Sequence, residues 1–583
     1  MQSHIFSVKV VHGTGVHQSC QAKVSASCRS LPRLDPTSLP PPMQMRARRS
    51  AAAAVALVLA LSSVLAVREA RGARAPGIIR RVADDDADND ERRPALVRLA
   101  FAGSDRAEQP TGMTVSWTTS RSGAPLKSVV LIGVAPGNLT HRVESTSPLS
   151  QQRYLPGGST HHHVAVLELE PSTTYYYRCG DDATFADGSG LSEETSFRTA
   201  PDVTKAGRGG EGGFTVGVWG DMGAGNCSVE TRAMLRKFDD QIDFVWHLGD
   251  IAYQDDYLFL DFAYERVLDE YMDSMSFLSQ TRPYMVLPGN HEVDCHAIVC
   301  ILDKTYRESL HNFTAYNARW RMPSEESGGI MNMWYSYNHG PAHFVSLDSE
   351  TDFPDAYENE HDEFFLLDSG HFNPTPNAYL EWLERDLKRA ASPEQRKLRP
   401  WIIVGSHRPM YIFKDAFILR EAVEDLLVKY EVDLFVSGHV HSYYRTFPVA
   451  NNGTFSPGYL PQQRKGKIVN IVVGGPGAID RPMAAAGARG SGWGARGAWD
   501  WLKRAALRGL YEGLLPLVLG RGRGPEAKAD PVNIKGAGEG GLVAHQTDEM
   551  SFGLLHVVNE TLLRWDLVSS KTGETIDTVE LRK

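Results

Sequence analysis

Two histidines close one of the apolar runs of this sequence. The run "VDLFVSG" is followed by His439 and His441, with a single residue between them. Neutral imidazole nitrogen is the commonest metal donor in proteins, so the pair could bind a metal ion. Because an isolated pair of this kind is more often part of an ordinary turn, metal binding requires further donors elsewhere in the chain.

Oxygen and nitrogen donors also follow four other apolar runs. They are Asp221 in "GDMG", Asp250 and Tyr253 in "GDIAY", Asn290 and His291 in "GNHE", and His407 in "GSH". A glycine lies shortly before each group, which permits a tight turn and a close approach of the backbone to a ligand. Because this pattern recurs at the end of each run, we predict that the donors converge on one edge of a sheet and hold two adjacent metal ions.

The donor types indicate which ions and which chemistry such a site supports. Carboxylate, amide and imidazole groups suit divalent Zn, Mn and Fe, and a phenolate among them favours Fe(III). A carboxylate is the natural bridge, since each of its oxygens can bind one ion. Two ions about 3.5–4 Å apart can bind both the attacking hydroxide and the phosphoryl oxygens of an in-line displacement. A site of this kind is therefore suited to in-line displacement at a phosphoryl group.

The elements that would position these donors lie in the region 212–583. From Phe214 onward, continuous apolar runs alternate with helical patterns such as "SVETRAMLRKF" and "NAYLEWLERDLKRA". Such alternation indicates an α/β domain in which a largely parallel sheet is covered by helices and binds its ligands beyond the carboxyl ends of the strands. The Gly-, Ala- and Arg-rich segment 480–541 is predicted to be a helical insert packed on this domain, with a membrane-surface or partner helix as the alternative.

The residues before this domain, 94–201, follow a shorter period. Alternating stretches such as "GMTVSWTT", "KSVVLIGV" and "TTYYYRCG" are separated by Gly, Pro and Asn turns, which predicts an antiparallel β-sandwich. The triplet His161–His163 enters one of these stretches, so we expect it to begin a strand rather than to bind metal.

The N-terminus has the features of a targeting segment. Residues 43–66 combine an arginine cluster, an apolar run and small residues, a signal-peptide pattern with cleavage after Ala66. An uncleaved anchor is the alternative, and membrane contact is expected only in that case. Residues 1–42 are then an extension before the true start or a disordered segment, and residues 67–93, which contain the acidic run 84–93, are a solvated linker.

Sequons and cysteines agree with a secretory route to the cell exterior or a vacuole. Five sequons follow the signal segment, at Asn138, Asn226, Asn312, Asn452 and Asn559, and predict glycosylation. The close pair Cys295 and Cys300 is a candidate disulfide, with two unpaired thiols as the alternative. The net charge of −10 gives no indication of a nucleic-acid partner.

The ordered blocks GDMG, GDIAY, GNHE, GSH and GHVH resemble those of the purple acid phosphatases in the metallophosphoesterase superfamily. The resemblance covers the chain from about residue 94, because the sandwich resembles the fibronectin type III-like domain of the plant-type members. It implies a secreted acid phosphatase that hydrolyses small phosphate monoesters with metal-bound hydroxide. Fe(III) would be held by Asp221, Tyr253 and His441, and the second ion (Zn, Mn or Fe) by Asn290, His407 and His439, with Asp250 as the bridge. His291 would bind the phosphate.

The chain departs from the plant-type pattern in one region. Plant-type members have one or two histidines about ten residues beyond the GSH-type histidine, where this chain reads "HRPMYIFKDAFILRE". Proton donation to the leaving group would then involve Arg408, Lys414, Asp415 or water. Two alternatives to a monoesterase stay open: a phosphodiesterase or pyrophosphatase on the same two-metal core, and a non-catalytic secreted binding protein.

Overall fold

The computed structural model describes residues 93–103, 112–120, 127–145, 147, 150–156, 158–181, 190–203, 213–255, 264–293, 295, 304–356, 372–373, 375, 377–413, 416–451, 453–477 and 541–583. The predicted extension, the signal segment, Asn452 and nearly all of the linker and the insert lie outside these residues. None of the helices in the described ranges is long and apolar enough to cross a membrane.

The first domain consists of two four-stranded antiparallel sheets, which confirms the predicted sandwich. One sheet has the order β1 (Ala95–Ala102), β2 (Gly112–Thr119), β6 (Thr160–Val166), β5 (Gln151–Gln152). The other has the order β4 (His141–Glu144), β3 (Ser128–Gly133), β7 (Thr174–Asp181), β8 (Thr195–Arg198). The triplet His161–His163 lies at the start of β6, as expected, and its buried rings contact hydroxyl groups of Ser116, Thr118, Thr119 and Ser128.

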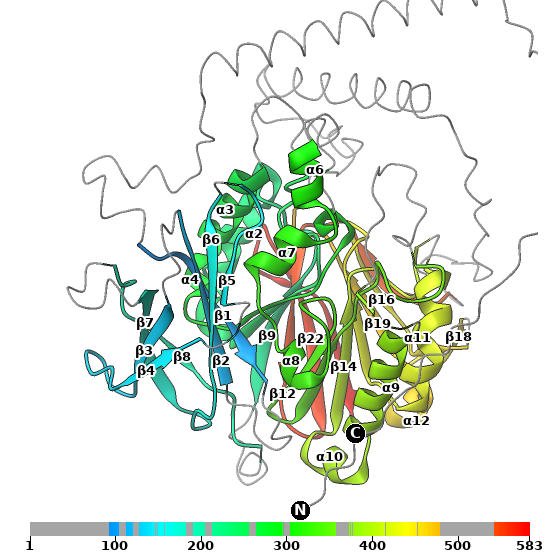
Figure 1. Cartoon of the computed structure of the whole chain (residues 1–583). Helices are drawn as coiled ribbons and strands as arrows, with labels where there is room; N and C mark the ends of the chain where they lie inside the picture. Colours follow the sequence, from blue (N-terminus) through cyan, green and yellow to red (C-terminus); the bar gives the residue numbers. More distant parts are fainter. Residues whose placement is uncertain are drawn as a thin grey trace, which may run out of the picture. The chain divides into compact units, whose positions relative to one another are not determined.

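The second domain contains two large mixed sheets (Figure 1). The six-stranded sheet has the order β11 (Tyr284–Val286), β10 (Phe244–His247), β9 (Phe214–Trp219), β21 (Ser551–Val557), β22 (Leu562–Ser569), β23 (Thr575–Arg582). The seven-stranded sheet has the order β12 (Tyr335–His339), β13 (Ala342–Ser346), β14 (Trp401–Ser406), β15 (Leu434–Ser437), β19 (Val469–Val473), β16 (Tyr443–Thr446), β20 (Val543–Thr547). A small hairpin pairs β17 (Val449–Ala450) with β18 (Thr454–Phe455).

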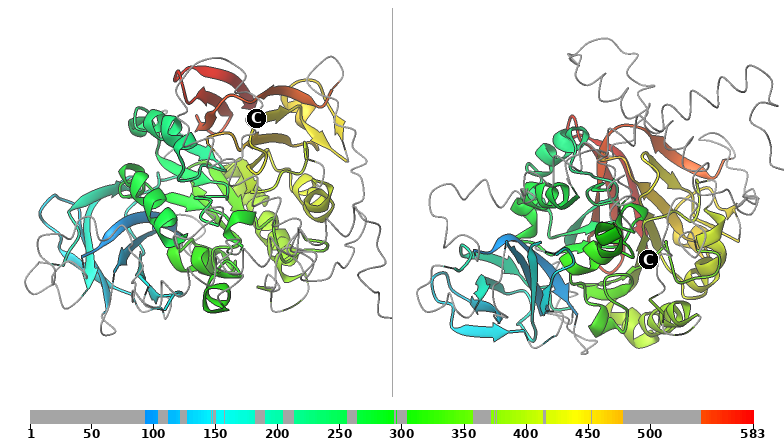
Figure 2. Two further views of the ribbon diagram at one scale, coloured as in Figure 1. Left: turned by 90° about the horizontal axis from the view of Figure 1, so that it is seen from above. Right: turned by 45° about the horizontal axis from the view of Figure 1, so that its top comes forward.

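The expectation of one largely parallel sheet is correct only for part of each sheet. Strands β9, β10 and β11 are parallel and form one side of the six-stranded sheet, and β13, β14, β15 and β19 are parallel in the seven-stranded sheet. Antiparallel strands lie on both sides of the second group, and β21, from the end of the chain, pairs antiparallel with β9 from the start of the domain (red in Figure 2). The predicted parallel runs are therefore divided between two sheets.

The two sheets face each other across an apolar core. The rings of Phe244 on β10 and Phe344 on β13 lie 5.5 Å apart, edge to face. The indole N–H of Trp246 donates to Ser346 Oγ at 3.0 Å. A Cβ at Gly405 would lie 2.5 Å from the Trp246 ring, so only glycine lets β14 approach this side chain. The close packing of the sheets fixes the strand ends from which the polar residues emerge.

Helices cover the outer sides of the sheets (Figure 1). They are α2 (Val229–Leu235), α3 (Tyr264–Ser274), α4 (Ser276–Ser279), α6 (Lys304–Leu310), α7 (Thr314–Arg319), α8 (Ser324–Ser327), α9 (Ala378–Ala390), α10 (Pro393–Leu398), α11 (Phe417–Lys429) and α12 (Pro461–Arg464), with 3-10 turns η5 (Asn226–Ser228), η6 (Asp239–Gln241) and η7 (Asn290–Glu292). Helix α9 buries Tyr379, Trp382, Leu383 and Leu387 on one face, the spacing that predicted it, and packs beside α11.

Candidate metal centre

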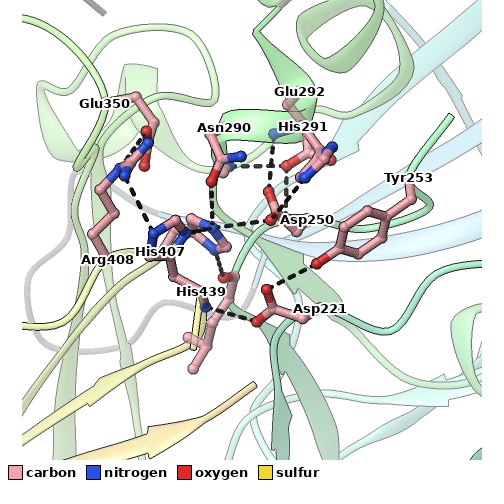
Figure 3. Close-up of polar contacts among 12 residues, drawn as sticks. Asp221, Asp250, Tyr253, Asn290, His291, Glu292, Glu350, His407, Arg408 and His439 are labelled. Atoms are coloured by element: carbon pink, nitrogen blue, oxygen red, sulfur yellow. Dashed lines mark hydrogen bonds and ion pairs between the residues drawn. The ribbon is translucent and has the colours of Figure 1, made fainter. Parts of the chain in front are cut away.

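The predicted donors follow the carboxyl ends of parallel strands in both large sheets. Asp221 follows β9, Asp250 and Tyr253 follow β10, and Asn290 and His291 lie in η7 after β11. His407 follows β14, and His439 and His441 follow β15. The prediction that they share one edge of one sheet is therefore wrong in detail, because the two facing sheets each supply part of the set. All of the predicted donors nevertheless come together in one site, and Figure 3 labels all of them except His441.

Three donors form a tight triangle at one side of the site. The Tyr253 hydroxyl lies 3.0 Å from Asp221 Oδ1 and 2.8 Å from His441 Nε2. His441 Nε2 lies 3.3 Å from the same Asp221 oxygen. Tyr253 and Asp221 are buried, whereas His441 is half-buried. A phenol, a carboxylate and an imidazole thus direct one donor atom each toward a common point.

Four donors form a second cluster around His407 Nε2. This nitrogen lies 3.1 Å from Asp250 Oδ2, 3.1 Å from Asn290 Oδ1 and 3.2 Å from His439 Nδ1. Asp250, His407 and His439 each offer a ligand atom, and these atoms all lie within 4.8 Å of one another. In the part of the chain that the structure describes, this is the group of His, Cys, Asp and Glu residues whose geometry could hold a metal ion.

The spacing and chemistry of both clusters fit metal ions. Ligands bound at about 2.1 Å in octahedral geometry lie about 3 Å apart, which is the separation found between the donor atoms in each cluster. Backbone contacts also link the clusters, since Asp221 Oδ2 accepts a hydrogen bond from His439 N at 2.7 Å. The donor set of imidazole, carboxylate, amide and phenol suits Fe, Zn and Mn better than Ca or Mg.

The backbone around the donors adopts unusual conformations. Asp221, Asp250, Tyr253 and His439 have φ values of 58°, 51°, 56° and 66°, in the left-handed region that costs non-glycine residues energy. A Cβ at Gly438 would lie 2.5 Å from Asp221 Oδ2, which confirms the expected close approach of a glycine to a donor at this strand end. Strain of this kind persists only where the surrounding structure holds the side chains in place.

Glu292 is a residue of the site to which the sequence assigned no role. It follows His291 in "GNHE", and its carboxylate accepts backbone hydrogen bonds from Asp250 at 2.8 Å, Ile251 at 2.9 Å and Gly289 at 2.9 Å. It therefore ties the loop after β10 to the loop after β11. A carboxylate three residues after a glycine at a turn is typical of a capping interaction, which is the signal that could have identified it.

The charges of the metal-free site strongly shift its pKa values. Burial opposes ionisation of Asp250, but the charges of His407 and His291 outweigh it and hold the pKa of this carboxyl well below its usual value. Burial also disfavours the charged form of His407, yet the Asp250 carboxylate raises the pKa of this imidazole to about 9. A proton on His407 thus takes the position of a positive charge that a metal ion would supply.

His291 is placed beside the clusters rather than within them. Its Nδ1 lies 2.9 and 2.8 Å from the two Asp255 oxygens, and its backbone N–H donates to Asp250 Oδ1 at 2.9 Å. The Gln254 amide donates to the His291 carbonyl at 2.6 Å. Its Nε2 is 3.9 Å from Asp250 Oδ2, so this ring is fixed with one nitrogen directed toward the proposed bridge. Asp255 and Gln254 belong to the "GDIAYQD" segment but had no assigned role.

The region that lacks the plant-type histidines is only partly described. Lys414 and Asp415 lie outside the described residues. Arg408 is buried beside the second cluster, where its Nε donates to Glu350 Oε2 at 2.7 Å and its Nη1 lies 3.3 Å from His439 Nε2 (Figure 3). A guanidinium keeps its protons at physiological pH, so Arg408 supplies charge rather than a transferable proton.

The secretory features remain predictions, and the described residues show how their sites are placed. Asn138, Asn226 and Asn559 are exposed, and Asn312 is half-buried. Cys295 is disulfide-bonded, and its predicted partner Cys300 lies outside the described residues. Cys179 and Cys227 are free thiols.

Comparisons with known proteins agree with the two domains. Residues 214–443 match the family model of calcineurin-like phosphoesterases, and residues 94–199 match that of the purple acid phosphatase N-terminal domain. An acid phosphatase of Aspergillus ficuum is 31% identical over 448 residues, which cover 59% of this chain and 71% of that protein. Acid phosphatase type 7 of Homo sapiens is 31% identical over 406 residues, with coverages of 67% and 79%.

A solved structure extends the similarity to the fold. Purple acid phosphatase PPD1 from seeds of yellow lupin (Lupinus luteus) matches with a TM-score of 0.54 at 20% identity, over 84% of this chain and 74% of that chain. At this identity the likeness concerns the fold, which combines a β-rich N-terminal domain with a phosphoesterase domain.

Proposed function

Because this chain belongs to the purple acid phosphatase family of calcineurin-like phosphoesterases, we propose that it hydrolyses phosphate monoesters at an Fe(III)–M(II) centre, with Zn, Mn or Fe as the second ion. The observation that carries the proposal is the Tyr253 hydroxyl, 3.0 Å from Asp221 and 2.8 Å from His441. A phenol among carboxylate and imidazole donors favours Fe(III) over a divalent ion at this position.

The proposed ligands divide into the two clusters described above. Iron is assigned to Asp221, Tyr253 and His441, and the second ion to Asn290, His407 and His439, with Asp250 bridging. When bound, the two ions would supply an activated water and neutralise charge on the phosphoryl group. Asp250 is proposed as the bridge because it belongs to the second cluster and follows β10 in the same loop as Tyr253 of the first cluster.

His291 is proposed to bind a phosphoryl oxygen of the substrate. Asp255 holds its Nδ1, which fixes the ring and leaves Nε2 on the side of Asp250. A protonated His291 could donate a charge-assisted hydrogen bond from Nε2 to an anionic ligand. This placement binds and orients the ester beside the metal ligands without making His291 a ligand itself.

Metal analysis and paired rate measurements test this function. Purified full-length protein should contain one iron and one further ion per chain, and should hydrolyse an aryl phosphate monoester near pH 5 faster than the corresponding diester. A higher rate on the diester or on pyrophosphate would replace the monoesterase assignment by one of its alternatives. Two bound ions without any hydrolysis would favour the non-catalytic alternative.

We also propose that the protein enters the secretory pathway and carries glycans. The signal-like segment 43–66 and the exposed sequons Asn138, Asn226 and Asn559 support this route. Mass spectrometry of the protein from a eukaryotic host should show a mature N-terminus near residue 67 and a mass loss on removal of N-glycans. An intact N-terminus with no glycan would contradict the proposal.

A further inference from the structure

The two histidines that flank the proposed second ion differ in what their outer nitrogens meet. His407 presents Nε2 to the cluster, and its Nδ1 lies 2.8 Å from the carbonyl oxygen of Leu248. His439 presents Nδ1 to the cluster, and its Nε2 lies 3.3 Å from Arg408 Nη1. A metal-bound histidine ordinarily donates its outer N–H to a carbonyl or a carboxylate. His407 follows this arrangement, whereas His439 meets a guanidinium, which has donors and no acceptor.

The position of Arg408 is fixed by buried partners. Its Nε donates to Glu350 Oε2 at 2.7 Å, and its backbone N–H donates to Ser349 Oγ at 2.9 Å. Ser349 Oγ in turn donates to Glu350 Oε1 at 2.9 Å, so both oxygens of this fully buried carboxylate are engaged. The Arg408 side chain is 10% exposed, and solvent therefore screens its charge only weakly.

The ring of His439 also contacts an aromatic side chain. Phe413 packs edge to face against it, with the ring centroids 4.7 Å apart. His439 thus faces the cluster through Nδ1 and the Arg408 guanidinium through Nε2. The contact between Nε2 and Arg408 joins a half-buried ring to a buried guanidinium.

A metal ion at His439 Nδ1 changes the character of this contact. The neutral imidazole must then carry its proton on Nε2, and an N–H group cannot accept a hydrogen bond from Arg408. The Nε2–H of His439 and an N–H of Arg408, both hydrogen-bond donors, then face each other next to the metal ion. The contact withdraws electron density from the ring and adds positive charge close to the ion, and both effects weaken the hold of His439 on the metal.

We propose that Arg408 is a positioning residue that weakens the second metal site, so that this ion binds less tightly than the first and keeps coordination open for substrate. Glu350 limits the effect by neutralising part of the guanidinium charge. This inference rests on the proposed two-ion centre. It concerns how one ligand is tuned, which the established family membership does not specify.

The affinity of the second ion distinguishes this role from a purely structural one. We would titrate Zn(II) into the metal-free full-length protein against a chromophoric chelator, which gives two dissociation constants without reference to activity. Arg408→Met should lower the larger constant by about ten- to hundredfold, the range through which outer partners change metal affinity. Arg408→Lys, which keeps the charge, should stay near wild type. If Arg408 merely held His439 in place, Arg408→Met would raise the constant instead.

A second variant keeps the test valid if an unpaired Glu350 destabilises the fold. The double variant Arg408→Met/Glu350→Gln removes the buried pair together, and it should still bind the second Zn(II) more tightly than wild type because Arg408 is the nearer charge. Glu350→Gln alone should weaken the second site. If both Arg408→Met variants bind two ions but bind the second ion no more tightly than wild type does, this inference is overturned. The proposed two-ion centre would still stand. Fewer than two ions in wild type would overturn the proposed centre and this inference with it.

Discussion

The backbone N–H of Asp250 donates to the Glu292 carboxylate at 2.8 Å, which joins the proposed bridging ligand to the turn that carries Asn290 and His291. Two further N–H groups, of Ile251 and Gly289, donate to the same carboxylate at 2.9 Å. Burial and the charge of Asp250 raise the pKa of Glu292 to about 8, although the N–H donors of Ile251 and Gly289 oppose this shift. Glu292 therefore organises the site without offering a donor to either cluster.

Glu292→Gln should destabilise the protein by about 1.5–3 kcal/mol, the worth of a hydrogen bond to a charged group. The amide has one oxygen for three N–H donors, and its own NH2 group would face at least one of them. Urea unfolding of the metal-free protein measures the loss. Glu308→Gln on the surface of α6 is the matched control and should change stability little, since Glu308 forms an exposed pair with Lys304. Equal effects of the two substitutions would contradict the assigned role.

Asp250→Asn should remove both metal ions, because the amide cannot bridge two cations as a carboxylate does. Asparagine has nearly the same shape as aspartate, so the variant should still fold. Any loss of metal should then result from the lost negative charge. Metal per chain, measured by mass spectrometry after gel filtration, gives the answer. Asp255→Asn is the control, since Asp255 contacts His291 and belongs to neither cluster. A protein that retains two ions after Asp250→Asn would exclude the bridging assignment.

His291→Ala should leave both ions in place and lower kcat/KM on an aryl phosphate. The corresponding loss of transition-state stabilisation is about 1.5–3 kcal/mol, the contribution of one charge-assisted hydrogen bond. Asp255→Asn should reproduce part of this effect, because it frees the ring that Asp255 holds at 2.8 Å. Steady-state kinetics measure the effect of each substitution on kcat/KM, and metal analysis shows whether both ions remain bound. If His291→Ala loses metal, then His291 is a ligand and the assignment is wrong.

The stability of the metal-free protein should fall as the pH rises from about 6.5 to 9. Burial lowers the pKa of His407, but Asp250 outweighs it and raises this pKa to about 9, above the value of about 6.5 in an unfolded chain. The folded state thus binds the His407 proton more tightly than the unfolded state does. The stabilisation from this proton is complete below about pH 6.5 and disappears as the pH rises through about 9. The expected loss is about 3 kcal/mol.

Urea unfolding in the presence of a chelator, at several pH values, measures this dependence. Glu292 has a raised pKa as well and acts in the same direction, so His407→Gln serves to isolate the contribution of the histidine. Wild type should lose more stability than His407→Gln between pH 6.5 and 9. Parallel curves for the two proteins would show that His407 holds no extra proton.

Sequence patterns predicted which side chains come together because each group of them follows the end of a strand closely. A glycine, a short polar motif and an apolar run are local features, and each can be identified without knowing which strands pair. The division of the strands between two sheets cannot be identified from such local features. It depends on pairings such as Gly553 with Val218 between β21 and β9, far apart in the chain, and nothing in either run specifies its partner.

The supporting residues were missed for a related reason. Glu350 and Arg408 meet across separate loops, and an isolated Glu or Arg in a sequence is usually a solvated surface residue. Glu292 and Asp255 stand inside quoted motifs, but their partners are backbone N–H groups and one ring nitrogen. Such contacts have no periodicity, and only the folded arrangement identifies them.

The oxidised protein should be violet to pink, and Tyr253→Phe should abolish the colour. A phenolate bound to Fe(III) absorbs visible light by charge transfer from ligand to metal. The Tyr253 hydroxyl is buried and lies 3.0 Å from Asp221 Oδ1 and 2.8 Å from His441 Nε2, so a metal ion held by these two residues would meet the phenol oxygen. Visible spectra of wild type and variant at matched iron content measure the effect.

Hydrolysis should survive this substitution in large part. Phe preserves the ring, which packs against His291 at a tilt with centroids 4.3 Å apart, and removes only the oxygen. Asp221 and His441 would still contact each other at 3.3 Å, and the second cluster contains no atom of Tyr253. Phe is therefore a better probe than Ala, since loss of the ring would also release His291. An iron-loaded wild type without a visible band, or a band unchanged in Tyr253→Phe, would remove Tyr253 from the iron site and leave a phosphoesterase centre of a different composition.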